Sequence, residues 1–335
     1  MSLVQKMQMR MGKPMFLALL AGLLLATMPM TAVAAQEKAT VAEDMTIMLD
    51  GKTVKLTDPA RVKANKLYMP VAQLAKVLGA KVDWDAVNEE ATIVNAVGDK
   101  IVLGNGVPVV YFNGARYVMD AVPFETDGRL YVPLRDAAEL LHAQVDWNDE
   151  ERIATLTPVP LAVVTEEVGV AAIAETSDAS AKQLLKRNEL GADATVEAGA
   201  ELRVVIPSIF EHEAKPFAEK DLLLLAKITQ VEAGYESYES QLAVANVILN
   251  RVKDSRFPST IKDVIYSGKQ FPPAHNGLLD KSVPKATALR AAKDALNGKN
   301  NVEDAVYFYN PKVTKGAFWS GLTVIDTIGT HRFAR

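Results

Sequence analysis

Three glutamates stand close together in the segment QVEAGYESYESQLAVANVILNRV, which covers residues 230–252. Glu232 precedes Gly234, whereas Glu236 and Glu239 follow it and begin a stretch with apolar residues at helical spacing. A carboxylic acid at a helix end in a partly apolar cleft has a raised pKa and can protonate a leaving oxygen, the central step in breaking a glycosidic bond. The plainer alternative is a solvated helix terminus, at which acids complement the helix dipole.

Two helices are predicted to position these acids. Apolar residues at helical spacing predict a buried helix over 221–231, which delivers Glu232 at its end and is stopped by the following glycine. A second helix is predicted over 236–252, with Glu239 in its early turns. Because the glycine interrupts the helix, the distance between the two acids is open: about 5 Å suits a retaining pair and roughly 6.5 to 9.5 Å an inverting pair. If Glu239 instead bonds to backbone or to Arg251, one carboxylate remains for chemistry.

Several separated blocks follow in order through residues 217–335, namely the Glu-Ala-Gly segment, LNRV, RFP, QF, YNP and IG-x-His-x-F. Together they resemble the catalytic domain of the spore-cortex-lytic enzyme and cell-wall hydrolase family, over essentially the whole region. The resemblance implies a mainly helical, lysozyme-like domain whose catalytic glutamate is Glu232. It also implies cleavage of the β-1,4 bond from N-acetylmuramic acid to N-acetylglucosamine in peptidoglycan. A link to sporulation rests on the family name alone.

The resemblance to single-glutamate enzymes favours a lytic transglycosylase. In the reaction that this resemblance implies, Glu232 would first protonate the glycosidic oxygen. As a base it would then remove the proton from the sugar's own 6-hydroxyl, so that a 1,6-anhydro sugar forms and no water is consumed. One alternative is a hydrolytic muramidase that uses Glu232 and Glu239. Another, from a different class, is a non-catalytic peptidoglycan-binding protein with an inactive lysozyme-like domain.

A sugar cleft needs flat apolar faces and amide-type hydrogen-bonding groups, and this region has both. Twelve of the chain's 22 aromatic residues lie in 217–335. The candidate substrate-binding residues are Tyr238, Gln241, Gln270, Phe271, Tyr307, Tyr309, Asn310, Trp319 and His331. Four of them stand in the QF and YNP blocks that match the family and are the best supported: Gln270, Phe271, Tyr309 and Asn310.

Residues 1–35 predict a secretory signal peptide. Three basic residues and no acid precede the apolar run FLALLAGLLLA, and the small residues Ala-Val-Ala-Ala follow at the expected cleavage site near Ala34 or Ala35. The alternative is an uncleaved membrane anchor, but the apolar core is short for a bilayer span of roughly 20 residues. No second long apolar stretch follows. We therefore expect a mature protein without a membrane span, secreted to the cell wall or cell envelope.

Charge and composition exclude several classes of function. Removal of residues 1–35 takes away three positive charges and no negative ones, which moves the formal net charge from -4 to -7 and argues against a nucleic-acid partner. The chain has no cysteine, so thiol nucleophiles and cysteine-ligated metals are excluded. Its four histidines show no HExxH spacing, which argues against a zinc enzyme. The sequence predicts no metal and no cofactor.

An internal repeat precedes these blocks. The segment KLYMPVAQLAKVLGAKVDWD at 66–85 recurs as RLYVPLRDAAELLHAQVDWN at 129–148, an offset of 63 with nine identities in twenty positions. Asp50-Gly51 is echoed by Asn113-Gly114 at the same offset. Each copy predicts a hairpin, a short strand, an amphipathic helix and a strand that ends at Val-Asp-Trp.

The two copies together resemble the copper amine oxidase N-terminal-like domain, a stalk module to which we assign residues 44–157. Trp84 and Trp147 occupy equivalent strand ends, and we expect them to close the core of each repeat rather than to stack on sugars. His142 is the sole histidine of this region, and nothing approaches a three-histidine copper site. We therefore expect neither copper nor oxidase activity.

Residues 161–208 predict a strand, two helices and a closing strand. They resemble a lysin motif, the small βααβ module that binds N-acetylglucosamine-containing glycans, best in QLLKRNEL and AGAELRVVIP. The opening strand departs from the family pattern, because Thr165-Glu-Glu167 stands where a Gly-Asp turn is expected; a structured spacer is the alternative. The whole chain is thus predicted to be a multidomain α+β protein, with a duplicated βα stalk, this module and a mainly helical lysozyme-like catalytic domain at 217–335.

Overall fold

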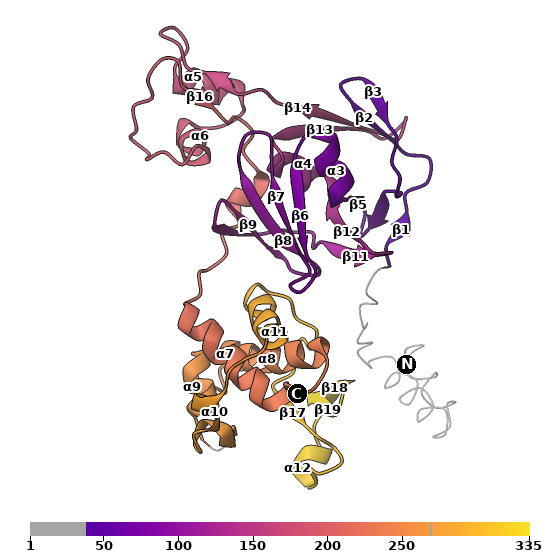
Figure 1. Ribbon diagram of the computed structural model, residues 1–335, viewed down its shortest axis with the longest axis vertical. Helices are drawn as coiled ribbons and strands as arrows, with labels where there is room; N and C mark the ends of the chain where they lie inside the picture. The colour runs from indigo at the N-terminus through magenta and orange to yellow at the C-terminus, as the bar shows by residue number, and fades with distance from the viewer. Residues whose placement is uncertain (1–37, 269) are drawn as a thin grey trace, which may run out of the picture. The chain divides into compact units, whose positions relative to one another are not determined.

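The computed structural model describes residues 38–268 and 270–335, and the predicted signal peptide at 1–35 lies outside them. The described chain has a sheet-rich N-terminal part, a small module with two short helices, and a mainly helical C-terminal part (Figure 1). The predicted multidomain α+β class is confirmed. Within the described ranges, no helix is long and apolar enough to cross a membrane.

Three sheets and two helices build the stalk. The first sheet has the order β1 (Thr40–Val41), β4 (Arg61–Lys63), β5 (Lys66–Pro70), β12 (Arg129–Pro133), β11 (Phe124–Thr126). The second has the order β10 (Ala115–Val118), β9 (Val109–Phe112), β8 (Lys100–Gly104), β7 (Glu90–Val94), β6 (Lys81–Asp85). The third has the order β13 (Ala143–Asn148), β14 (Ile153–Pro158), β2 (Thr46–Leu49), β3 (Lys52–Val54). The helices are α3 (Val71–Val77) and α4 (Leu134–Leu140).

The predicted repeat is present in the fold, because β5, α3 and β6 recur as β12, α4 and β13. The two copies meet where β5 and β12 pair antiparallel in the middle of the first sheet. Asp50-Gly51 and Asn113-Gly114 form the predicted hairpin turns, with positive φ at all four positions. Buried aliphatic side chains from both copies, including Met69, Leu74, Val132 and Leu140, share one core.

The prediction that two tryptophans close the cores of the repeats is wrong. Trp84 and Trp147 are 42% and 40% exposed. The strands that carry them, β6 and β13, each lie at the edge of a sheet and pair with one neighbour only. Aliphatic residues of the inner strands, such as Ile101 and Leu156, fill the core instead.

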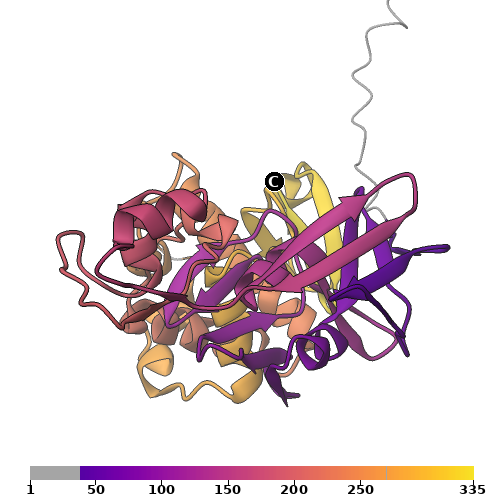
Figure 2. The same ribbon diagram turned by 90° about the horizontal axis from the view of Figure 1, so that it is seen from above.

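The module at 161–208 has its elements in the predicted order. β15 (Ala162–Val163) pairs antiparallel with β16 (Glu201–Leu202), and the two helices between them lie side by side: α5 (Val170–Thr176) and α6 (Ala181–Arg187) (Figures 1 and 2). Ser180 and Gln183 form a capping box that starts α6. A small core that includes Ile173, Leu184 and Leu202 holds the module together. Glycan binding by it stays a prediction.

The C-terminal part is mainly helical, with a small sheet. A short helix η2 (Ser208–Glu211) precedes it, and its helices are α7 (Glu219–Ala233), α8 (Tyr238–Lys253), α9 (Ile261–Tyr266), η3 (Pro272–Ala274), α10 (Leu278–Lys281), α11 (Ala286–Leu296) and α12 (Ala317–Ser320). The sheet has the order β17 (Tyr307–Tyr309), β19 (His331–Ala334), β18 (Val324–Ile328). Helix α8 is buried along most of its length, between α7, α11 and the sheet.

Two local signals place Glu232. Helix α7 runs two residues beyond the predicted end, and Gly234 is its C-terminal cap. A β-carbon at Gly234 would lie 2.3 Å from the backbone oxygen of Gln230, so only glycine fits this close turn. Ser237 then caps the start of α8 by accepting a hydrogen bond from the backbone N–H of Ser240. Glu232 is thus held on the last turn of a buried helix.

Candidate active site

Glu232 borders a cavity of about 590 Å³ in the C-terminal part. Side chains from α7, α8, β17, α12 and β19 and from the connecting loops form its walls. The lining residues are Glu232, Arg251, Gln270, Phe271, Tyr307, Phe308, Tyr309, Asn310, Thr314, Phe318, Trp319 and His331. Glu232 is the one carboxylate among them.

The environment of Glu232 suits a general acid. Its side chain is partly buried, and this burial raises the pKa of the carboxyl group above its ordinary value. No neighbouring charge in the described part of the chain contributes to the shift. A carboxyl group of this kind keeps its proton to higher pH, which is what donation to a leaving oxygen requires.

Aromatic rings form one wall of the cavity. The ring centroids of Tyr309 and Trp319 lie 5.0 Å apart, those of Phe318 and Trp319 5.1 Å, and those of Tyr307 and Phe318 5.5 Å. Phe318 is 57% exposed, so an apolar ring face is open to a ligand. Such a row of rings suits the apolar faces of sugar rings.

The structure brings six of the predicted catalytic and substrate-binding residues to this cavity. They come from separate blocks of the sequence: Glu232, Gln270, Phe271, Tyr309, Asn310 and His331. The additional candidates Tyr307 and Trp319 line it as well. Phe271 is only 1% exposed and supports the wall from behind. The Asn310 side chain accepts a hydrogen bond from the backbone N–H of Lys312 and thereby shapes the loop after β17.

Two predicted substrate-binding residues lie outside the cavity. Tyr238 donates a hydrogen bond to Asp294 of α11 at 2.5 Å, and its ring packs under the guanidinium of Arg290. Gln241 is 2% exposed and donates to the backbone oxygen of Glu236 at 3.0 Å. Both side chains lie on faces of α8 that are covered by other segments, Tyr238 by α11 and Gln241 by the turn before α8. Which face of α8 is covered depends on where these segments lie in the fold.

Glu239 is also absent from the cavity lining. It is exposed on the first turn of α8, and its backbone oxygen accepts a hydrogen bond from Asn301 at 2.8 Å. The contact with Arg251 that the sequence left open is not present among the described residues. Glu239 therefore does not form a pair of carboxylates with Glu232 across this cavity.

Glu236 has a larger role than the charged helix start that the sequence suggested. Its carboxylate accepts hydrogen bonds from the hydroxyls of Ser240 and Thr330, and Oε1 lies 3.1 Å from Nδ1 of His331. Burial alone would raise the pKa of Glu236, but the hydrogen bonds from Ser240 and Thr330 hold it below its ordinary value. Gly329 has φ +59°, and a β-carbon there would lie 2.3 Å from Oε2 of Glu236. Glu236 thus joins the start of α8 to the β18–β19 turn and lies next to His331 of the cavity wall.

Sequence reasoning missed four residues of the cavity wall: Arg251, Phe308, Thr314 and Phe318. Arg251 stood within the LNRV block, which was a usable signal. Thr314 and Phe318 follow the YNP block in a segment without a motif, so only the fold reveals them. Across the described residues, no group of three or more histidine, aspartate or glutamate side chains is arranged to hold a metal ion.

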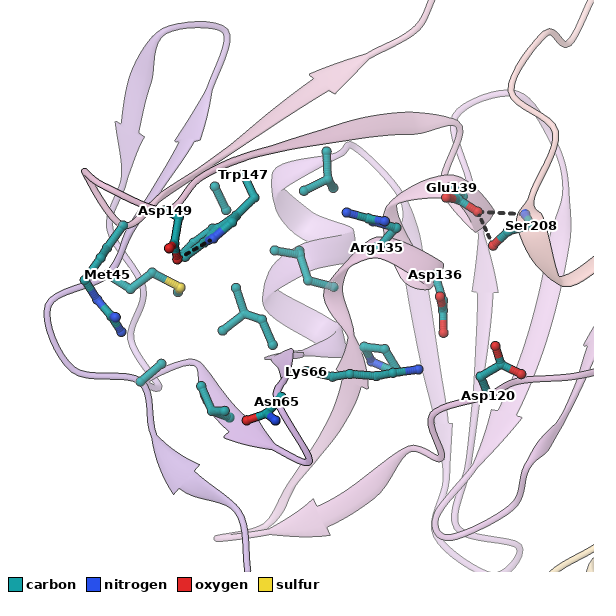
Figure 3. Close-up of a pocket in the computed structure, with 18 residues that line it drawn as sticks. Met45, Asn65, Lys66, Asp120, Arg135, Asp136, Glu139, Trp147, Asp149 and Ser208 are labelled. Carbon is teal, nitrogen blue, oxygen red and sulfur yellow. Dashed lines mark hydrogen bonds between the residues drawn. The ribbon is translucent and has the colours of Figure 1, made fainter. Parts of the chain in front are cut away.

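A second cavity, of about 830 Å³, lies in the stalk. Figure 3 shows Trp147 and its hydrogen bond to Asp149 at one side, and Lys66, Asp120 and Asp136 together at the other. Burial, and then the nearby charge of Glu139, raise the pKa of Asp136 to about 6.

The raised pKa of Asp136 predicts that the stability of the folded protein depends on pH. Because its pKa is raised in the folded state, the wild-type protein loses stability as pH rises from about 4 to about 6. The acids Glu139 and Asp120 add to the shift, and Lys66 and Arg135 oppose it. Asp136→Asn is therefore expected to raise the unfolding free energy by about 1 to 2 kcal/mol at pH 7. Denaturant unfolding measures this difference between variant and wild type, which is expected to vanish near pH 4. An equal effect at both pH values would contradict this cause.

Comparison with known families gives each end of the chain a counterpart. Residues 235–334 match the family model described as Cell Wall Hydrolase, and residues 48–156 match the model described as Copper amine oxidase N-terminal domain. These two of the three resemblances seen in the sequence are therefore confirmed, whereas the lysin-motif resemblance of residues 161–208 stays a prediction. The chain carries a cell wall hydrolase domain and a copper amine oxidase N-terminal-like domain.

Curated relatives match the C-terminal region. The spore cortex-lytic enzyme of Bacillus subtilis is 37% identical over 117 residues, which is 35% of this chain and 38% of that protein. The spore cortex-lytic enzyme of Halalkalibacterium halodurans is 38% identical over 118 residues, 35% of each chain. The solved catalytic domain of the germination-specific lytic transglycosylase SleB from Bacillus anthracis has 32% identity over 36% of this chain and 99% of that chain, with a TM-score of 0.35. The chain spans less than half the length of these curated relatives.

Proposed function

Because residues 235–334 form a cell wall hydrolase domain, we propose that this chain is an exported enzyme that cuts peptidoglycan at the β-1,4 bond from N-acetylmuramic acid to N-acetylglucosamine. We further propose that it acts as a lytic transglycosylase with Glu232 as acid and base. One observation carries the proposal: Glu232, with a pKa raised by burial, is the one carboxylate among the described residues that line the aromatic cavity. The names of its relatives, spore cortex-lytic enzymes, support a cell wall substrate.

The reaction needs a single carboxyl group used twice. Protonated Glu232 gives its proton to the glycosidic oxygen, and the bond from that oxygen to the anomeric carbon breaks. The resulting carboxylate then takes the proton of the 6-hydroxyl as that oxygen bonds to the anomeric carbon. Glu232 ends protonated, the product is a 1,6-anhydro sugar, and no water enters.

The geometry argues against hydrolysis by a pair of carboxylates. Such a mechanism needs a second carboxylate about 5 to 9.5 Å from the acid, across the scissile bond. Glu239 is exposed outside the cavity, and Glu236 is engaged by Ser240 and Thr330. A non-catalytic binding protein is also disfavoured, because it has no need of a carboxyl group whose pKa is raised by burial at the cavity.

The N-terminal parts of the chain are compatible with an enzyme that acts on an insoluble polymer. We propose that the module at 161–208 binds N-acetylglucosamine-containing glycan, and that the predicted signal peptide directs the protein out of the cytoplasm. The stalk then acts without copper, as a spacer or a second attachment point. A binding measurement with the isolated glycan and a chain that lacks 161–208 tests the module separately from cleavage.

Mass spectrometry of a digest tests the reaction itself. Purified peptidoglycan is incubated with the full protein, and the released muropeptides are chemically reduced. Transglycosylation predicts 1,6-anhydro ends that resist reduction, whereas hydrolysis predicts ends heavier by one water and by the two hydrogens of reduction. Release of reducible products alone would overturn the transglycosylase mechanism, and no release at all would overturn the enzyme.

A further inference from the structure

The cavity in the stalk has an apolar wall and a charged end. Its volume is about 830 Å³, which is enough for an organic group of moderate size. Trp147 forms one side, is 40% exposed and donates its indole N–H to Asp149 at 3.3 Å. Other apolar side chains continue this wall: Met45, Val62, Leu67, Leu134 and Val145. The charged end lies at the other side, where Figure 3 shows Asp120, Asp136 and Lys66 together.

The first copy of the repeat has a closed hydrogen-bond network at the place that corresponds to this charged end. Gln73, the counterpart of Asp136 at the offset of 63, donates to the carboxylate of Asp58 at 2.7 Å. Its side-chain oxygen accepts from the backbone N–H of Thr57 at 2.8 Å. Arg129 then pairs with the same Asp58 at 3.2 Å. The polar side chains of this network therefore satisfy one another within the chain.

The second copy lacks the network, because its central carboxylate is missing. Ala121 stands at the position of Asp58, and Lys66 at the position of Arg129. Across residues 38–268 and 270–335, the side chain of Asp136 has no hydrogen bond and no ion pair, and the same holds for Lys66. The same scaffold is thus closed by its own side chains in one copy and open to a ligand in the other.

The charges at the open end favour a cation. Burial, and then Glu139 and Asp120, raise the pKa of Asp136 to about 6, although Lys66 and Arg135 oppose them. Asp136 is therefore ionised at neutral pH at a cost in stability, which no contact in the described part of the chain offsets. A ligand cation beside Asp136 would offset it, because it would lower that pKa and stabilise the folded protein.

The chemistry of the ligand follows from both sides of the cavity. An ammonium group suits the carboxylates, and an aliphatic chain suits the apolar wall. We propose that the stalk cavity binds an alkylammonium group, with its chain against the wall that includes Trp147 and its charge at Asp136 and Asp120. If the chain acts on peptidoglycan as proposed above, the source of this group is the free amine of a diamino acid in stem peptides that are not cross-linked.

A pair of small probes tests the cavity without any reference to the reaction. Binding of n-hexylamine and of 1-hexanol to the purified protein is measured by titration calorimetry at pH 7. The amine is expected to bind about tenfold more tightly. Asp136→Asn is expected to remove most of this preference, and Lys66→Gln to increase it, because a competing cation is lost. Asp146→Asn is the matched control, because Asp146 is exposed on β13 and does not line the cavity.

The pH dependence gives a second readout. The preference for the amine is expected to fall severalfold from pH 7 to pH 5, because Asp136 takes up a proton through its pKa of about 6 while the amine keeps its charge. Binding of the alcohol is expected to stay constant. Equal binding of amine and alcohol by the wild type, or an unchanged preference in Asp136→Asn, overturns the proposal.

Sedimentation with insoluble peptidoglycan tests the source of the amine. The Glu232→Gln variant is mixed with intact wall and with wall whose free amines have been blocked by acetic anhydride. More protein is expected on the unblocked wall, and Asp136→Asn in the same background is expected to remove the difference. Hexylamine binding without any effect of blocking overturns wall peptides as the ligand. A failure of the wild type to release muropeptides would count against the proposed function and leave these binding results unchanged.

Discussion

Glu232→Gln is expected to lower muropeptide release by about a thousandfold or more, while binding of glycan strands is retained. Glutamine has nearly the same shape as glutamate but has no proton to give and cannot act as a base, so both steps of the proposed reaction fail. The partly buried position at the end of α7 tolerates the neutral side chain, because burial already favours the uncharged form of Glu232. Release is measured by chromatography of reduced muropeptides, and binding by sedimentation with insoluble peptidoglycan.

Glu239→Gln is the matched control for this prediction. Glu239 is seven residues away and exposed, and it does not line the cavity. We expect its activity to stay within about twofold of wild type, as for surface changes away from the reacting groups. Similar losses in both variants would point to a pair of carboxylates and would contradict the single-glutamate mechanism.

The raised pKa of Glu232 predicts the alkaline side of the pH profile of cleavage. Because the general acid must be protonated, the rate of cleavage is expected to fall as pH rises through the raised pKa of Glu232. That fall lies at a higher pH than for an ordinary glutamate. A profile that falls only near the ordinary glutamate pKa would show that burial of Glu232 is not what tunes the reaction.

Glu236→Ala is expected to cost about 2 to 4 kcal/mol of unfolding free energy at pH 7 and to lower cleavage at least tenfold. The change removes the acceptor of the Ser240 and Thr330 hydroxyls and the partner of His331. The β18–β19 turn then loses its bond to the start of α8, and a side chain of the cavity wall is released. Chemical denaturation and muropeptide release measure the two effects.

The pH dependence of this loss gives an internal check. The pKa of Glu236 is lowered in the folded protein, so its contribution is present above its ordinary pKa near 4.5 and is lost as pH falls below that value. The difference in stability between wild type and variant must therefore shrink in acid. Glu219→Ala, on an exposed residue in the first turn of α7, is expected to cost less than about 1 kcal/mol at any pH. If Glu219→Ala lowered the unfolding free energy as much as Glu236→Ala, the loss in Glu236→Ala could not be assigned to its contacts with Ser240, Thr330 and His331.

Local patterns predicted much of the fold. The hairpin turns at Asp50-Gly51 and Asn113-Gly114 and the strand-helix-strand order of the repeats depend on neighbouring residues, and the structure has them. Thr260 caps α9 by accepting a hydrogen bond from the backbone N–H of Asp263, again a contact between near neighbours in the sequence. Trp84 and Trp147 were misjudged because their burial depends on which strands lie at sheet edges, and that is set by distant pairings.

The candidate active site also contains residues that local patterns predicted and residues that only the fold reveals. Gln270 and Asn310 reach the Glu232 cavity, because the QF and YNP blocks that contain them lie where the chain leaves α9 and β17. Tyr238 and Gln241 do not reach the cavity. The spacing of apolar residues shows that α8 is buried, but it does not show which of its faces packs on α11 and which borders a cavity. Arg251 shows the converse: its orientation depends on rings from three distant segments.

The stalk shows that a unit of duplication need not be a unit of folding. β5 and β12, one from each copy, exchange their hydrogen bonds in the middle of one sheet. β14, at the end of the second copy, pairs in parallel with β2, in the hairpin that begins the first copy. Neither copy therefore closes its own sheet. Loss of either copy would remove one of the two neighbouring strands from β5 or β12 and from β2 or β14, so each copy completes two sheets of the other.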